Sequence, residues 1–206
     1  KAASDILDGP LIQHSELASK IQDLHIFFSL LIPDMSHEEK QLLDEALIIT
    51  YNRKGITHEN QSLIDPEQPE RYKPMPILGD VHEVLMEKAE TKRLANILNR
   101  MVHGSASSFN QQTNVDLSNK YVVLDISELS GDLLTVGMFV ALDFVWSKAK
   151  EDRTVEKAIF IDEVWKLIGA ASNEMAAEYV LEIFKIIRGY GGSGVCATQD
   201  LTDFFS

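Results

Sequence analysis

Residues 155–166 read VEKAIFIDEVWK, and this stretch decides the fold. The four apolar residues at 158–161 run directly into two adjacent acids, Asp162 and Glu163. A short apolar run bounded by charge is typical of a strand that is buried on both faces of a parallel sheet. The two carboxylates at its carboxyl end are predicted to lie at the rim of that sheet, where open α/β folds bind ligands.

An apolar strand that ends in Asp-Glu is the pattern of a Walker B strand in a nucleotide-hydrolysing ATPase. In such a site the Asp holds Mg²⁺, usually through water, and the Glu orients or deprotonates the attacking water. The pattern is short, and a buried strand that ends in two solvated acids explains it equally well. Asp125 also ends an apolar run, but Ile126 follows it in place of a second acid, so we interpret Asp125 as structural.

Strands and helices are predicted to alternate on both sides of this stretch. Apolar runs and helical periodicity predict, in chain order, a strand at 121–126, a helix at 131–150, a strand at 157–161, a helix at 173–188 and a strand at 194–198. This order predicts right-handed βαβ units and a parallel sheet. We therefore expect an α/β domain over residues 111–206.

Residues 1–110 are predicted to form an all-helical block without a catalytic constellation. Apolar periodicity predicts helices at 11–32, 37–52 and 77–102, the last with a break near 89–91. Ser36 and Glu39 form a capping-box pattern at the start of the second helix. Long polar connections are expected at 56–76 and 105–119.

The composition is that of a globular protein with an acidic surface. Hydrophobic residues make up 45% of the 206 residues, and the formal net charge is −13. An acidic surface repels phosphate backbones, which argues against DNA as the ligand gripped by this chain. The single cysteine, Cys196, lies in an apolar run and is predicted to be a buried core thiol. The six histidines are scattered without metal-ligand spacing, so a zinc site is not predicted.

Two further positions carry hypotheses about a site. Gln199 follows the strand at 194–198, where a polar side chain can contact a γ-phosphate or the attacking water. Arg188 ends the helix at 173–188. A cation at a helix C-terminus is favourable by roughly 0.3–1 kcal/mol without any other role. The functional alternative for Arg188 is that it stabilises charge that develops on a phosphate.

Glycines are concentrated at 189–194, GYGGSG, which matches the G-x-G-x-x-G pattern. These glycines follow a helix and precede a strand, whereas a dinucleotide-binding loop follows a strand and opens a helix. We therefore interpret them as a helix end and a tight turn. The sequence contains no G-x-x-x-x-G-K-[ST] phosphate loop, so a Walker B strand here is half of a site at most.

Three segments resemble the VirB-type ATPases that energise type IV secretion and bacterial conjugation. AIFIDEVW at 158–165 resembles the Walker B strand of that family, with Val164 in place of the commoner Ala. FKIIRGYGGSGVCATQ at 184–199 resembles the block that follows it. YVVLDISEL at 121–129, with NVDL at 114–117 before it, resembles the strand ahead of the Walker B segment.

The resemblance implies a partial RecA-like P-loop NTPase core, a parallel sheet with flanking helices, plus an all-helical subdomain inserted at residues 1–110. It implies ATP and Mg²⁺ as cofactors and a P-loop upstream of Lys1. It also implies residue roles: Asp162 for Mg²⁺ through water, Glu163 for the hydrolytic water, Gln199 as the γ-phosphate sensor and Arg188 for a phosphate of its own or a neighbouring subunit. Gly189 replaces the usual basic neighbour after Arg188.

The resemblance further implies an ATP-hydrolysing motor that powers pilus assembly or substrate transfer together with other type IV secretion components. Such a motor is expected to be cytoplasmic, homo-hexameric and peripheral at the inner face of the cell membrane through its partners. Two alternatives stay open: a DNA-pumping translocase of the FtsK or HerA kind, and a non-catalytic interaction module. Without a phosphate loop, these 206 residues alone are expected neither to hydrolyse ATP nor to bind it tightly.

Overall fold

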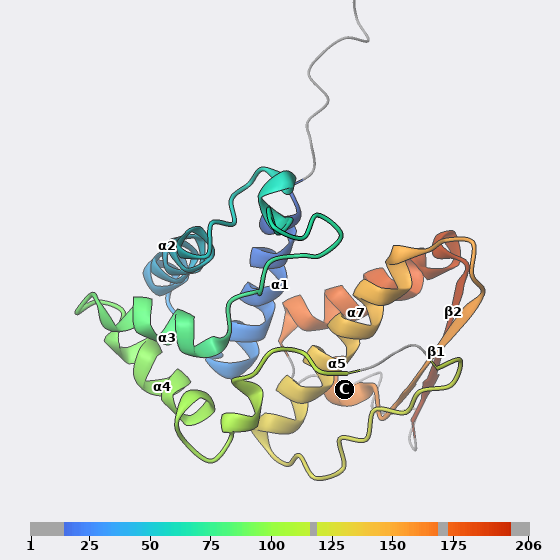
Figure 1. Cartoon of the computed structure of the whole chain (residues 1–206). Coiled ribbons are helices and arrows are strands. Elements are labelled where there is room, and N and C mark those ends of the chain that lie inside the picture. The colour runs from blue at the N-terminus through green and yellow to red at the C-terminus, as the bar shows by residue number, and fades with distance from the viewer. Residues whose placement is uncertain (1–14, 116–118, 169–172, 199–206) are drawn as a thin grey trace, which may run out of the picture. The chain divides into compact units, whose positions relative to one another are not determined.

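The computed structural model describes residues 15–115, 119–168 and 173–198 (Figure 1). The described residues form two compact units, the first comprising 15–22 and 41–112, and the second comprising 23–40 and the described residues from 113 onward. Residues 23–40 thus group with the second unit although they precede the first unit's residues 41–112 in the chain. Helices α1 (Glu16–Leu31) and α2 (His37–Arg53) therefore each contribute residues to both units. None of the described helices is long and apolar enough to cross a lipid bilayer.

The first unit is helical and surrounds an aliphatic core. Besides parts of α1 and α2 it contains η1 (Asn60–Leu63), α3 (Leu78–Met86), α4 (Lys92–Val102) and η2 (Ser107–Phe109). Leucines at helical spacing are fully buried: Leu43 and Leu47 on α2, Leu85 on α3, and Leu94 and Leu98 on α4. The predicted break in the helix at 77–102 is confirmed, because the buried Thr91 hydroxyl donates to the carbonyls of Leu85 and Lys88 between α3 and α4.

The capping box predicted before α2 is confirmed in both directions. The Glu39 N–H donates to Ser36 Oγ at 3.1 Å, and the Ser36 N–H donates to Glu39 Oε2 at 2.9 Å. These bonds satisfy donors that the first turn of a helix leaves without partners. The start of α2 is therefore determined by local sequence.

The connection predicted at 56–76 contains secondary structure of its own. It includes η1, and residues Ile64 and Tyr72 form an isolated antiparallel bridge. The Lys73 ammonium donates to the Gly55 carbonyl at 2.7 Å, and Ile56 is fully buried. This segment is thus tied to the end of α2 by a hydrogen bond and by the burial of Ile56.

The second unit contains the predicted parallel βα arrangement. After α5 (Asp132–Glu151) come β1 (Lys157–Asp162), α6 (Trp165–Ile168), α7 (Glu174–Ile186), η3 (Ile187–Tyr190) and β2 (Gly192–Ala197). The two strands pair in parallel with Lys157 opposite Gly192 and Asp162 opposite Ala197. Figure 1 shows α5 and α7 on the same side of the two strands.

The prediction that β1 is buried on both faces is wrong. Ile159 is 9% exposed, whereas its neighbour Phe160 is 74% exposed. Alternate residues of a strand point to opposite faces, so the helices cover the face that carries Ile159 and leave the other open. Val195, the register partner of Phe160, is likewise exposed. Cys196 is exposed as well, so the prediction of a buried core thiol is also wrong.

The strand predicted at 121–126 is not present as a strand. Tyr121 is 84% exposed and Val123 is 68% exposed, and the segment is not hydrogen-bonded into the sheet. A β-strand exists only where a neighbouring strand satisfies its backbone groups, and in the described part of the chain β1 and β2 pair with each other alone. Apolar content predicted the strand, but pairing decides whether it forms.

A buried polar contact joins α5 to α7. The Tyr179 hydroxyl donates to Asp143 Oδ1 at 2.8 Å, and Asp143 is among the buried residues. The pKa of Tyr179 lies far above its usual range. Burial of the hydroxyl is the larger cause, and the negative charge of the Asp143 carboxylate is the second. The Tyr179 ring also packs against the Phe139 ring, with 5.3 Å between the two ring centroids. The two long helices of the second unit are therefore held in register by a specific polar pair within an apolar contact.

Candidate functional site

The acidic pair Asp162–Glu163 lies at the carboxyl edge of the parallel strands. Asp162 is the last residue of β1 and is opposite Ala197, the last residue of β2. The Asp162 side chain is exposed, and its Oδ1 accepts a hydrogen bond from the Glu163 N–H at 3.0 Å. The sheet edge predicted from sequence to bind ligands therefore does carry both carboxylates.

The backbone of Glu163 is in an unusual conformation. Its φ is +54°, and among the described residues it is the non-glycine residue with a positive φ. Such a conformation costs an L-residue about 1–2 kcal/mol. The Glu163 N–H also donates to the Ala197 carbonyl at 3.0 Å, and the Glu163 carbonyl accepts from the Lys166 N–H at 3.0 Å. The strand-to-helix turn is therefore held from both sides while its central residue is strained.

Two buried residues fix the short helix that follows the acids. Val164 and Leu167 are both fully buried, and the Leu167 N–H donates to the Val164 carbonyl at 2.9 Å. Trp165, between them, is half-buried, and its indole N–H donates to Glu163 Oε2. Sequence reasoning assigned no role to Trp165. The signal available was an aromatic N–H donor two residues beyond the acid.

Arg188 lies at the other end of the strands. It belongs to η3, which precedes the first residue of β2, and that residue pairs with Lys157 at the start of β1. A strand rises about 3.3 Å per residue, so the strands separate this edge from Asp162 by roughly 15 Å. The Arg188 side chain is exposed and has no hydrogen bond or ion pair with another described residue. One subunit therefore does not bring Arg188 and Glu163 together.

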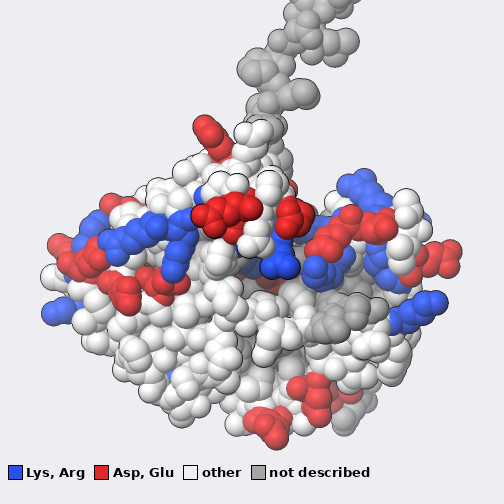
Figure 2. Space-filling model, viewed as in Figure 1, with Lys and Arg blue, Asp and Glu red and all other residues white. Residues whose placement is uncertain are grey.

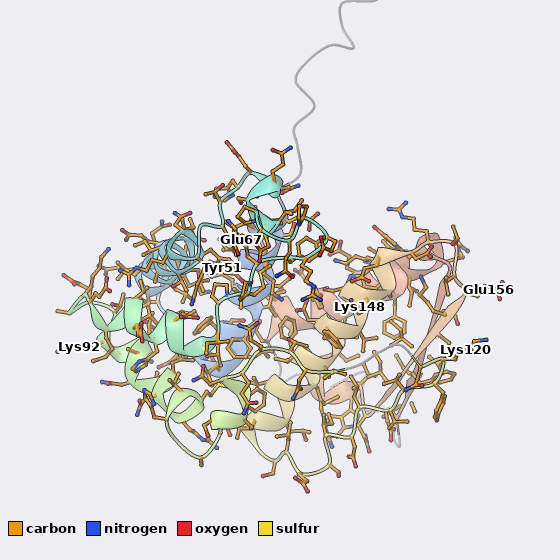
Figure 3. The ribbon with its side chains drawn as sticks, viewed as in Figure 1. Tyr51, Glu67, Lys92, Lys120, Lys148 and Glu156 are labelled. Atoms are coloured by element: carbon orange, nitrogen blue, oxygen red, sulfur yellow. The ribbon has the colours of Figure 1, made fainter. Side chains whose placement is uncertain are left out.

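Cations and aromatic rings gather at this amino edge. The Lys157 ammonium donates to the carbonyls of Ala149 at 2.9 Å and Tyr190 at 3.1 Å. The Arg153 guanidinium lies 4.3 Å from the centroid of the Tyr190 ring. Lys148 on α5 and Glu156 just before β1, both labelled in Figure 3, flank this segment in the chain; Lys148 forms an ion pair with Glu151. The hydrogen bonds of Lys157 and the contact of Arg153 with the Tyr190 ring join the end of α5 to the start of the sheet.

The glycine-rich segment acts as the predicted helix end and turn. Gly191 ends η3 with φ +71°, and a Cβ placed on it would lie 2.7 Å from the Arg153 carbonyl oxygen. A Cβ at Gly194 would lie 2.4 Å from Phe184 Cε1 of α7. The glycines therefore allow a left-handed turn and a close approach of β2 to α7, and the segment opens a strand, unlike a dinucleotide-binding loop.

Of the two remaining sequence candidates, Asp125 and Gln199, the structure describes Asp125. Asp125 Oδ1 accepts a hydrogen bond from the Ser127 N–H at 2.9 Å, and that backbone bond holds the pKa of the Asp125 carboxyl below its usual range. This is a local turn contact of the kind Asp commonly makes. Gln199 lies outside the described residues; Ala197, two positions earlier, is the register partner of Asp162.

The donor groups at the carboxyl edge fit Mg²⁺ held mostly by water and phosphate. No group of three or more His, Cys, Asp or Glu suited to a metal ion occurs among the residues that the structure describes. Mg²⁺ in nucleotide sites is usually bound by one or two carboxylates together with substrate phosphates and several waters. An exposed Asp162 with a second carboxylate next to it meets that requirement.

Comparison with known proteins identifies a matching family and similar solved structures. A family model described as the TraG P-loop domain matches residues 78–206, more than half of the chain. The structure of VirB4 of Thermoanaerobacter pseudethanolicus is similar with a TM-score of 0.80 and 28% sequence identity. The similarity covers 94% of this chain and 52% of that one, so the chain spans about half the length of the solved VirB4. No curated protein sequence matches the chain.

Proposed function

Because the chain belongs to the TraG P-loop domain family, we propose that the intact protein is an ATP-hydrolysing motor subunit of a bacterial conjugation or type IV secretion apparatus. The observation that carries the proposal is the placement of Asp162 and Glu163 at the carboxyl edge of β1, with Glu163 in a strained turn. Backbone strain of this kind concentrates at functional sites. The fold is a partial RecA-like core with a small parallel sheet, and open α/β folds generally bind ligands at the carboxyl edge of their strands.

In the proposed site the two acids have separate tasks. When bound, ATP with Mg²⁺ supplies the γ-phosphoryl group and neutralises the charge on the phosphates. Asp162, the exposed carboxylate, holds Mg²⁺ through water. Glu163 orients the attacking water and accepts its proton, and Gln199, on the chain beyond β2, contacts the γ-phosphate or that water. The helical residues before 110 are proposed to be the subdomain inserted into this core.

Arg188 is proposed to act across a subunit boundary. Its exposed guanidinium lies at the amino edge of the strands, away from Asp162 and Glu163 of the same chain. An arginine supplied in trans can stabilise the charge that develops on a transferred phosphoryl group. The proposal therefore includes a homo-oligomer, a hexamer, in which Arg188 of one subunit reaches the nucleotide of the next.

The likeness to VirB4 supports a proposed setting for this motor. The motor would work with other type IV secretion components in substrate transfer or pilus assembly. It would lie in the cytoplasm at the inner face of the cell membrane, attached through those partners. Since the chain spans about half of the solved VirB4, this setting is proposed for the whole protein.

The test is ATP turnover by full-length protein carrying Glu163→Gln. Glutamine keeps the size of the side chain and removes its ability to accept a proton, so kcat is expected to fall by about 10²–10³-fold while ATP binding is retained. Asp125→Asn is the matched control, because Asp125 also ends an apolar run but makes a local turn contact that the amide oxygen of asparagine preserves. Turnover of Glu163→Gln at the wild-type rate would contradict the role of Glu163.

A further inference from the structure

The side chain of Glu163 has a donor partner within its own turn. The Trp165 indole N–H donates to Glu163 Oε2, and the two residues are separated by Val164 alone. The Lys166 ammonium lies 5.7 Å from the centroid of the Trp165 ring, within the range of a cation–π interaction. The indole is therefore in contact on one edge with the carboxylate and over its face with a cation.

The backbone around this contact is fixed. The Glu163 N–H is held by the Ala197 carbonyl and by Asp162 Oδ1, each at 3.0 Å. After the turn, the fully buried Val164 and Leu167 anchor α6 to the interior. Because the main chain is restrained on both sides of Glu163, the orientation of the carboxylate is set by the torsions of its side chain and by the groups that bind it.

The indole of Trp165 is suited to orient this carboxylate. An indole N–H can only donate a hydrogen bond, and an ionised carboxylate can only accept one. The hydrogen bond between them can therefore form in one direction, from the indole to the carboxylate. Hydrogen bonds to a charged acceptor are shorter and stronger than neutral ones. A rigid ring that carries the donor therefore selects one orientation of the Glu163 carboxylate out of those that the chain allows.

We infer that Trp165 is a positioning residue for Glu163. Its indole N–H holds the carboxylate at the carboxyl edge of β1 in the orientation needed to act on the hydrolytic water. The inference deepens the proposed function and rests on the role given there to Glu163. Trp165 acts through Glu163 and is not itself assigned a contact with nucleotide.

The contact can be tested without nucleotide by NMR of the indole N–H groups in the 206-residue chain. The chain has two tryptophans, and Trp146, which is buried against Tyr190, serves as the internal reference. Glu163→Ala removes the acceptor, so the Trp165 indole proton is expected to move upfield and to exchange faster with water, while the Trp146 signal stays in place. An unmoved Trp165 signal overturns the inference.

The role can be tested by the kinetics of two substitutions in the full-length protein. Trp165→Phe removes the donor and is expected to lower kcat by roughly 10- to 100-fold, as misplacement of a reacting group does, with KM for ATP nearly unchanged. Trp165→His keeps a five-membered ring whose Nε2–H lies as many bonds from Cβ as the indole N–H. It is expected to recover most of the lost kcat.

The two arms separate this inference from the proposed function. If Glu163→Gln abolishes turnover but Trp165→Phe leaves kcat at the wild-type value, positioning by Trp165 is wrong and the function of Glu163 stands. Equal losses of kcat in the Phe and His variants would assign the effect to ring packing and also overturn the inference. If Glu163→Gln keeps full turnover, the role proposed for Glu163 fails, while the NMR result still decides whether the contact between Trp165 and Glu163 exists. The NMR arm leaves Trp165 intact, so it decides the contact even where a Trp165 variant unfolds.

Discussion

At the scale of single residues, the conformation of Glu163 is the feature that links structure to function. A glycine would adopt φ +54° without strain, yet the position carries a glutamate. The neighbouring hydrogen bonds, from the Glu163 N–H to Ala197 and to Asp162, hold this conformation in place. A residue type that costs stability where glycine would not is expected at positions where the side chain itself is required.

Alanine is usually the more stable of the two small residues in a strand or helix. At position 163 we expect the opposite order of stability, with glycine above alanine. Both remove the carboxylate, but alanine keeps the strain, so Glu163→Gly is expected to be about 1 kcal/mol more stable than Glu163→Ala. Urea denaturation of the 206-residue chain gives the two free energies of unfolding. Ala158→Gly, in β1 where φ is not positive, is the control and should lose about 0.5–1 kcal/mol. Equal stabilities of Glu163→Gly and Glu163→Ala would contradict strain at this residue.

At the scale of elements, the sheet depends on how closely β2 approaches α7. Gly192 and Gly194 lie on the strand face turned to the helical side, where a Cβ would meet Ile187 at 2.7 Å and Phe184 at 2.4 Å. Asn173 caps α7 through its side chain, which accepts from the Met175 N–H at 2.9 Å. Local capping therefore starts the helix, while small residues on the following strand let the two elements pack.

Gly194→Ala is expected to destabilise the chain by about 1–3 kcal/mol, because the new methyl group would displace the Phe184 ring. Gly189→Ala is the matched control: nothing lies within 4 Å of a Cβ there and its φ is not positive. That control should be neutral or gain about 0.4–1 kcal/mol through a less flexible unfolded chain. Thermal or urea unfolding of both variants measures the difference. A Gly194→Ala chain as stable as the control would mean that β2 and α7 are not packed this closely.

At the scale of the whole molecule, the charge of the surface indicates which ligands this chain can bind. Its net charge is −13, and on the face shown in Figure 2 acidic and basic side chains are interspersed without a large basic patch. The sheet face that carries Phe160 and Val195 is open. Electrostatic grip on a nucleic acid needs a concentration of lysine and arginine, which neither the composition nor the visible face provides.

The 206-residue chain is accordingly expected not to saturate a fluorescent 30-base-pair DNA duplex at protein concentrations up to about 10 µM in physiological salt. Proteins that bind DNA non-specifically have dissociation constants of roughly 1–100 µM under these conditions, so this concentration range would detect the tighter of them. Fluorescence anisotropy at low and at physiological salt measures this directly. Tight binding that weakens steeply with salt would contradict the expectation and would favour a DNA-pumping translocase over a secretion motor.

The sequence by itself determined the elements whose causes are local. The Ser36–Glu39 capping box, the break near Thr91, the helices at 131–150 and 173–188 and the order of β1 and β2 could all be predicted, because caps, periodicity and apolar runs act within a few residues. The motif also identified Asp162 and Glu163 as the acids at the carboxyl edge of a strand. The same residues carried the family resemblance, which the match to the TraG P-loop domain confirms.

Tertiary structure alone decided the features that depend on distant parts of the chain. Residues 121–126 are apolar enough for a strand but have no strand partner among the described residues, and the exposure of Phe160 depends on which sheet face the helices cover. The separation of Arg188 from Glu163 follows from the parallel pairing of β1 with β2. The strained turn of Glu163 depends on a hydrogen bond to Ala197, 34 positions along the chain. Such pairings leave no periodic or capping pattern in the sequence, because they are set by which backbone groups meet in space.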